Sequence, residues 1–294
     1  MTSIPLLQAG QATGQTPLRY LAGLVLTLLG TLLLALPVVL GIQALMRQRG
    51  HVAFLDSYLL LGVNALVIPV LWLVMAKLHR RPFMDMIAPG RRFDTGMLAR
   101  SALVFAVPLL VQVGWGLLAG DLRQADTPAA LFLALLPLTL LLFLAQASAE
   151  ELLFRGYLAQ GMQVAFRHAL PGALIGAALF TAAHEGSGNQ AVWTQRAAIM
   201  VMALFLSWTT VRFGRLEAAM GVHIVNNILF SIFIGGSALP FPGVTTLTDP
   251  DPPDFQGVAE VLEFAAVQAA TIGFYWLAGV RTGFIARGLS PRQA

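Results

Sequence analysis

The sequence predicts an all-α, polytopic membrane protein with about eight transmembrane helices that enclose a polar cavity. Of its 294 residues, 57% are hydrophobic and only 11% are charged, less than half of the roughly 25% charged residues usual in soluble domains. The net charge of +4 is spread between apolar segments and forms no continuous basic patch. We therefore interpret it as a topology signal and do not expect a nucleic-acid partner. The absence of cysteine excludes disulfides, thiolate metal ligands and a cysteine nucleophile.

Eight apolar segments account for the predicted helices, since about 20 residues of helix cross a membrane. They are residues 21–46, 54–76, 98–119, 129–160, 170–184, 195–213, 216–235 and 258–280. The fifth is the shortest, and Pro171 with nearby glycines leaves both of its ends open. We expect the acidic, proline-rich stretch 249–254 to be a solvated loop.

The Lys and Arg residues indicate an orientation, because they concentrate in cytoplasmic loops. An N-terminus in the cytoplasm leaves few basic residues in outer loops, namely Arg47, Arg49, Arg123 and Arg196. It also makes the second, inner loop strongly basic, with Lys77, Arg80, Arg81, Arg91 and Arg92. We expect a multi-pass protein of the cell inner membrane with both termini cytoplasmic. Its expected parts are a leader (1–20), three flanking helices (21–120), a catalytic core (129–235), an outer loop (236–257) and a last helix with a basic tail (258–294).

Charged and polar residues interrupt three of the apolar segments, where ionisable groups are costly and mark functional sites. Glu150, Glu151 and Arg155 occur in the sequence EELLFRG. Glu151 and Arg155 are four residues apart and face each other on a helix, so we predict a structural ion pair. Glu150 is rotated by about 100° from Glu151, so its partner must come from another helix. Such a carboxylate is suited to take a proton from water.

His184, His223 and Asn227 lie in the other two interrupted segments. With a rise of about 1.5 Å per residue, Glu150 and these three residues fall at compatible depths from the inner ends of their helices. The histidines could bind a metal with Glu150, carry protons or donate to an oxyanion. Asn227, four residues after His223, could orient the imidazole or join an oxyanion hole. A single buried histidine is more often a packing residue, but two histidines, a glutamate and an asparagine at matched depth favour a functional site.

Other hydrolase patterns do not fit. His184-Glu185 begins like a zinc-binding HExxH helix, but Gly188 stands where the second histidine is required. The sequence has no GxSxG motif and no pair of aspartates within the spans. We expect Glu185 at the outer interface, and Glu260 and Glu263 on a solvated face at the start of the last span.

Three motifs on successive segments together resemble one family: Glu150-Glu151-x-x-x-Arg155, Phe180-x-x-x-His184 and His223-x-x-x-Asn227. They are similar to the CPBP (ABI) family of intramembrane proteases, which includes the Rce1-type CAAX prenyl proteases, and the match covers residues 131–235.

The resemblance implies an eight-span helical core and a glutamate-dependent peptidase. It implies that Glu150 activates water with His184, that His223 and Asn227 bind the oxyanion, and that Glu151 and Arg155 support the site. Because members are often called metalloproteases, it also implies a possible divalent metal such as zinc on Glu150, His184 and His223.

The expected partners are the lipid bilayer and a membrane-embedded or lipidated peptide or protein substrate. Two other functions stay open on the sequence alone. One is a proton-coupled membrane transporter that uses the same acids as a relay, although the inverted repeats and broken helices of such folds are not evident. The other is a non-catalytic immunity or scaffold membrane protein that keeps the motifs.

Overall fold

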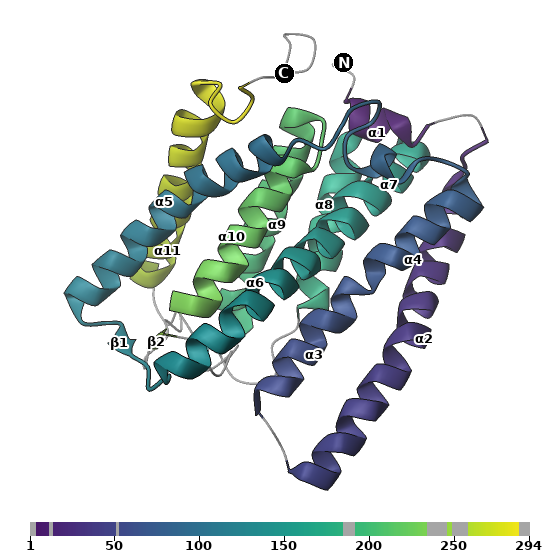
Figure 1. Cartoon of the computed structure of the whole chain (residues 1–294). Helices are drawn as coiled ribbons and strands as arrows, with labels where there is room; N and C mark the ends of the chain where they lie inside the picture. Colours follow the sequence, from purple (N-terminus) through teal and green to yellow (C-terminus); the bar gives the residue numbers. More distant parts are fainter. Residues whose placement is uncertain are drawn as a thin grey trace.

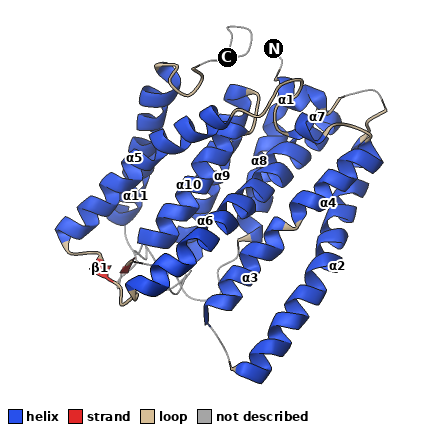
Figure 2. Cartoon of the chain, viewed as in Figure 1, coloured by secondary structure: helices blue, strands red, loops and turns tan. Residues whose placement is uncertain are grey.

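The computed structural model describes residues 4–11, 14–50, 53–184, 192–233, 246–248 and 258–287. Within these residues the chain is a bundle of helices (Figure 1). The described strands are two residues each, β1 (Arg123–Gln124) and β2 (Leu247–Thr248), and they pair antiparallel. Figure 2 shows this small ladder at the end of the bundle opposite α1. The all-α prediction is confirmed apart from the ladder.

The helices follow the predicted apolar segments to within a few residues. Their bounds are α1 Pro5–Ala9, α2 Pro17–Arg49, α3 Ala53–Ala65, α4 Val67–Leu73, η1 Val74–His79, η2 Phe83–Met86, α5 Thr95–Ala119, α6 Ala129–Glu151, η3 Leu152–Leu158, α7 Ala159–Phe166, α8 Ala169–Ala183, α9 Val192–Phe213, α10 Glu217–Phe233, α11 Val258–Phe274 and η4 Tyr275–Arg281. The short α1, in the predicted leader, was not foreseen. The stretch 249–254, predicted to be solvated, lies outside the described residues.

Six helical segments in the described part of the chain are long and apolar enough to cross a membrane. They are Pro17–Gln48, Leu55–His79, Thr95–Ala119, Ala129–Phe166, Arg196–Phe213 and Val258–Arg281. The apolar helices α8 and α10 are shorter. Large apolar side chains face outward from the bundle, such as Trp115 at 70% and Leu118 at 86% exposure. Exposed apolar surface of this extent is what a lipid environment covers.

One assumption behind the predicted depths was wrong: the fourth segment is not an unbroken α-helix. Directly after Glu151 the chain forms the π-helix η3, and regular α-helix resumes at Ala159. Short π-helical stretches are rare and frequently occur at functional sites. This change from α-helix to π-helix places Arg155 inside the π-helix. It also changes the angle about the helix axis between side chains at the two ends of this long segment.

Helix α10 is held in the middle of the bundle, where it packs against α5, α6 and α9. Its approach to α5 depends on Gly221, because a Cβ there would lie 2.3 Å from the carbonyl oxygen of Leu98. The hydroxyl of Ser101, on α5, donates to the carbonyl of Ala218 at 2.7 Å. These contacts fix the position of the helix that bears His223 and Asn227.

Candidate functional site

The structure brings the predicted site residues together from three helices. Glu150 and Glu151 are the last residues of α6, His184 is the C-cap of α8, and His223 and Asn227 lie on α10. The contacts described below link all of them, and their common depth in a membrane stays a prediction.

Glu150 is buried, with 9% of its surface exposed, and its two oxygens have different surroundings. Oε1 accepts a hydrogen bond from Nε2 of Gln146 at 2.5 Å. Oε2 lies 3.5 Å from Nε2 of His223 and 3.8 Å from Nε2 of His184. Among the described residues, none donates a hydrogen bond to this buried Oε2 within normal distance. The two imidazole partners of Glu150 come from other helices, as predicted, but the amide that donates to it comes from its own helix.

Both imidazoles are oriented through their Nδ1 atoms. Nδ1 of His223 lies 2.8 Å from Oε1 of Glu151, and Nδ1 of His184 lies 2.7 Å from the carbonyl oxygen of Phe180. A carboxylate and a carbonyl can only accept, so each Nδ1 carries a proton and donates it. Both Nε2 atoms are thereby turned toward Oε2 of Glu150.

The ion pair between Glu151 and Arg155 is confirmed, with 2.9 Å between Oε1 and Nη1. Both side chains are buried, at 0% and 2% exposure, and Arg155 also donates to the carbonyl of Ala203 at 3.1 Å. Burying a charge is costly unless it is paired and hydrogen-bonded. Because Oε1 of Glu151 also accepts from His223, the pair supports an imidazole of the site.

The ring of Phe180 packs against the guanidinium of Arg155 and against both imidazoles. Cζ of Arg155 lies 4.4 Å from the centre of the Phe180 ring. The ring centres of His184 and His223 lie 4.3 Å and 5.7 Å from it. An aromatic face attracts a cation and packs against an imidazole, which gives a physical reason for a phenylalanine four residues before His184.

Asn227 reaches the site through Gln146, a residue to which the sequence assigned no role. Nδ2 of Asn227 donates to Oε1 of Gln146 at 3.1 Å, and Oδ1 of Asn227 accepts from Asn226 at 3.2 Å. Gln146 is buried and therefore connects the amide on α10 with Glu150 on α6. Its one sequence signal was an amide in an apolar run, four residues before Glu150.

The predicted metal set of Glu150, His184 and His223 stays a prediction. Within the part of the chain that the structure describes, no group of three or more His, Asp or Glu residues could hold a metal ion. The steps proposed below are derived for the side chains of this chain alone. Glu260 and Glu263 are exposed at the start of α11, as expected, and Glu185 lies outside the described residues.

The fold and site together define a multi-pass helical membrane protein with a buried carboxylate, imidazole and amide cluster. Residues 132–229 match the family described as type II CAAX prenyl endopeptidase Rce1-like. The matched segment contains every predicted site residue, so the similarity to this family lies in the part of the chain that forms the site.

A relative is the uncharacterized protein YyaK of Bacillus subtilis (strain 168), 31% identical over 202 residues. The similarity covers 65% of this chain and 66% of YyaK, just under two thirds of the length of that protein. No solved structure matches the chain significantly.

Proposed function

We propose that the chain is an intramembrane endopeptidase in which Glu150 activates a water molecule to hydrolyse a peptide bond. The observation that best supports this proposal is the arrangement around Oε2 of Glu150. Nε2 of His223 lies 3.5 Å from this oxygen, and Nε2 of His184 lies 3.8 Å from it. Polar atoms separated by more than about 3.5 Å can be bridged by water. A water molecule held there would contact a carboxylate base and the imidazole of His184.

In the first step, Oε2 of Glu150 takes a proton from this water as its oxygen bonds to the carbonyl carbon of the substrate. The carbonyl oxygen becomes an oxyanion. Nε2 of His223, when it carries a proton, and the amide of Asn227 donate hydrogen bonds to it. An amide nitrogen carries two hydrogens, and one of those on Asn227 goes to Gln146, so the other can serve the oxyanion.

In the second step, the carbon–nitrogen bond breaks and Glu150 returns its proton to the leaving amine. The products are an amine and a carboxylic acid, and the acid becomes a carboxylate when it releases the second proton of the water to solvent. Gln146 acts as a positioning residue, because it binds Oε1 of Glu150 and the amide of Asn227 at the same time. Base and oxyanion donor are thus held by one side chain on α6.

The proposed substrate is a membrane-associated or lipidated peptide or protein, in keeping with the peptidase family that the chain matches. We further propose that α8 and α10 complete an eight-helix membrane core around a polar cavity, with both termini in the cytoplasm. Burial of the site among apolar helices would restrict it to substrates that enter from the bilayer.

The test is purified protein in liposomes that contain a membrane-embedded reporter peptide, with the products identified by mass spectrometry. The proposal predicts two fragments whose summed mass exceeds the mass of the intact peptide by that of one water molecule. A proton-sensitive dye inside the same liposomes tests the transporter alternative. Proton-coupled solute flux without any fragment would reject the peptidase.

A further inference from the structure

Asn226 is a polar residue of α10 that takes no part in the chemistry proposed for Glu150. It precedes Asn227 in the otherwise apolar sequence IVNNILF, and it is half-buried. At about 100° per residue, Asn226 projects from the helix about 60° to one side of His223, and Asn227 about 40° to the other. The three side chains therefore share the face of α10 that forms the site.

Four side chains form a chain of hydrogen bonds that runs in one direction, from Asn226 through Asn227 and Gln146 to Glu150. An ionised carboxylate can only accept, so Gln146 donates to Glu150 through Nε2, at 2.5 Å. Oε1 of Gln146 then accepts from Nδ2 of Asn227 at 3.1 Å. In turn, Oδ1 of Asn227 accepts from Nδ2 of Asn226 at 3.2 Å. The carboxylate of Glu150 thus determines the orientation of all three amides.

This chain of hydrogen bonds ends at an acceptor that is not used. Nδ2 of Asn226 is the atom that faces Asn227, so Oδ1 of Asn226 points elsewhere. No donor among the described residues bonds to this oxygen. A carbonyl oxygen with apolar neighbours is stabilised when it gains a donor. Asn226 is therefore prepared to accept a hydrogen bond from a bound molecule.

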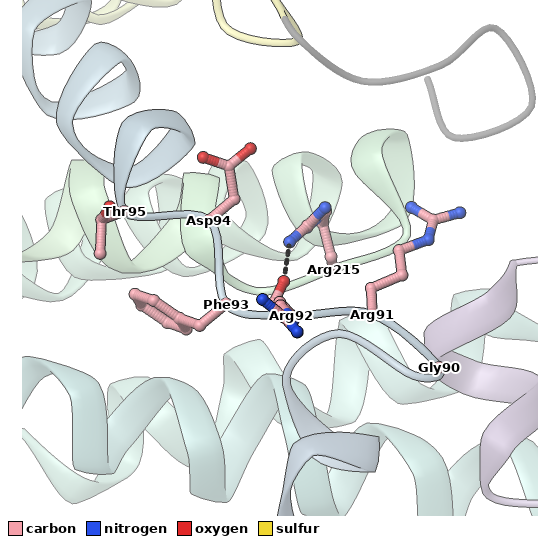
Figure 3. Close-up of a pocket in the computed structure, with 7 residues that line it drawn as sticks. All are labelled: Gly90, Arg91, Arg92, Phe93, Asp94, Thr95 and Arg215. Atoms are coloured by element: carbon pink, nitrogen blue, oxygen red, sulfur yellow. Dashed lines mark hydrogen bonds between the residues drawn. The ribbon is translucent and has the colours of Figure 1, made fainter.

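The amide of Asn226 is also on a helix whose start is fixed in place. The guanidinium of Arg215 donates to the carbonyl of Arg92 at 3.0 Å, the dashed line in Figure 3. Glu217 accepts from Nε of Arg215 at 2.9 Å and from the backbone N–H of Asp94 at 3.1 Å. These bonds tie the start of α10 to the loop before α5, so the acceptor is positioned before a substrate arrives.

We infer that Asn226 is a substrate-binding residue, whose Oδ1 accepts a hydrogen bond from a backbone N–H of the peptide close to the bond that is cut. This inference rests on the proposed peptidase function. An extended peptide advances by about 3.3–3.6 Å per residue, which is comparable with the 3.2 Å between the amides of Asn226 and Asn227. A substrate whose scissile carbonyl oxygen contacts Asn227 can therefore present a neighbouring N–H to Asn226.

The contact with Asn226 also specifies the conformation of the substrate. A backbone N–H inside an α-helix already donates to the carbonyl four residues earlier, so it is not free to donate to Asn226. The site therefore selects a peptide segment that is extended, and not helical, around the scissile bond.

The test is a double-mutant cycle between the chain and its substrate, measured as the KM for cleavage of the reporter peptide by the full chain in liposomes. In a set of reporters, one backbone N–H near the scissile amide, but not the scissile amide itself, is replaced by an ester oxygen. One of these esters should raise the KM of wild type by roughly 2- to 10-fold, the effect of losing one hydrogen bond. In Asn226→Ala that ester should have no such effect, because the cycle isolates the contact that both changes remove.

Gln112→Ala is the matched control, because Gln112 is also half-buried and its amide donates to a side chain of another helix, Thr271 at 3.1 Å. This variant should show the same ester effect as wild type. If Asn226→Ala unfolds, Asn226→Leu replaces it, since leucine is closer in size to asparagine and also lacks the acceptor.

Three outcomes decide the inference. An ester effect that is lost in Asn226→Ala and kept in the control supports it. An ester effect of equal size in Asn226→Ala and wild type, or no effect of any ester on wild type, would overturn it while leaving the peptidase function intact. No cleavage of the unmodified reporter by wild type would reject the peptidase function and the inference together.

Discussion

Glu151 and His223, on neighbouring helices, are joined by a hydrogen bond of 2.8 Å between Oε1 and Nδ1. The same oxygen of Glu151 pairs with Arg155 at 2.9 Å. The second glutamate of the EExxxR motif thus has two tasks: it neutralises a buried guanidinium and it orients an imidazole of the site.

Arg155→Ala should lower the free energy of unfolding by about 3–5 kcal/mol, because breaking one side of a buried pair strands the other charge. Chemical denaturation in detergent, followed by tryptophan fluorescence, measures the loss. The double variant Glu151→Gln with Arg155→Gln removes both charges and should recover most of it. No recovery in the double variant would argue against charge stranding as the cause.

Gln146→Leu should reduce turnover by about 10- to 100-fold, the loss typical when a residue that orients site groups is removed. The substitution deletes the contacts to Glu150 and Asn227 at once, whereas substrate affinity should change little. Gln112→Leu is the matched control, since Gln112 also makes a side-chain hydrogen bond between helices, to Thr271 at 3.1 Å. Equal losses in the two variants would assign Gln146 a merely structural role.

Asn227→Ala should reduce turnover by about 100- to 1,000-fold with little change in substrate affinity, as expected when one oxyanion donor is lost. The pH optimum should not move, because an amide does not titrate in the working range. Steady-state kinetics from acid to alkaline pH measure both quantities. Full turnover in this variant would remove Asn227 from the oxyanion site.

Peptidase activity should survive removal of divalent metal ions, since the proposed steps need only Glu150, the two imidazoles and Asn227. Dialysis against a strong chelator, with metal content measured by mass spectrometry, tests this. Activity that disappears with the metal and returns with one zinc per chain would instead support the predicted ligand set of Glu150, His184 and His223.

The parts of the fold that depend on local sequence were predictable. Apolar runs of about 20 residues mark helices wherever they occur, so the helix bounds agree closely, and the spacing of Glu151 and Arg155 was enough to pair them. The π-helix after Glu151 was not predictable, because it depends on how neighbouring helices pack. Gln146 was overlooked because its role requires Asn227, 81 positions away, to meet it in space.

The most direct measurement of the central claim compares wild type with Glu150→Gln in hydrolysis of the membrane-embedded reporter peptide. The amide keeps the shape and hydrogen-bonding capacity of the side chain but cannot act as the base, and loss of a general base costs about 100- to 10,000-fold in rate. Glu263→Gln, the same change on the exposed side of α11, is the control and should keep full activity. The account predicts fragments from wild type and from the control, with cleavage by Glu150→Gln reduced at least about 100-fold and its thermal unfolding unchanged. Equal cleavage by Glu150→Gln and wild type would contradict it.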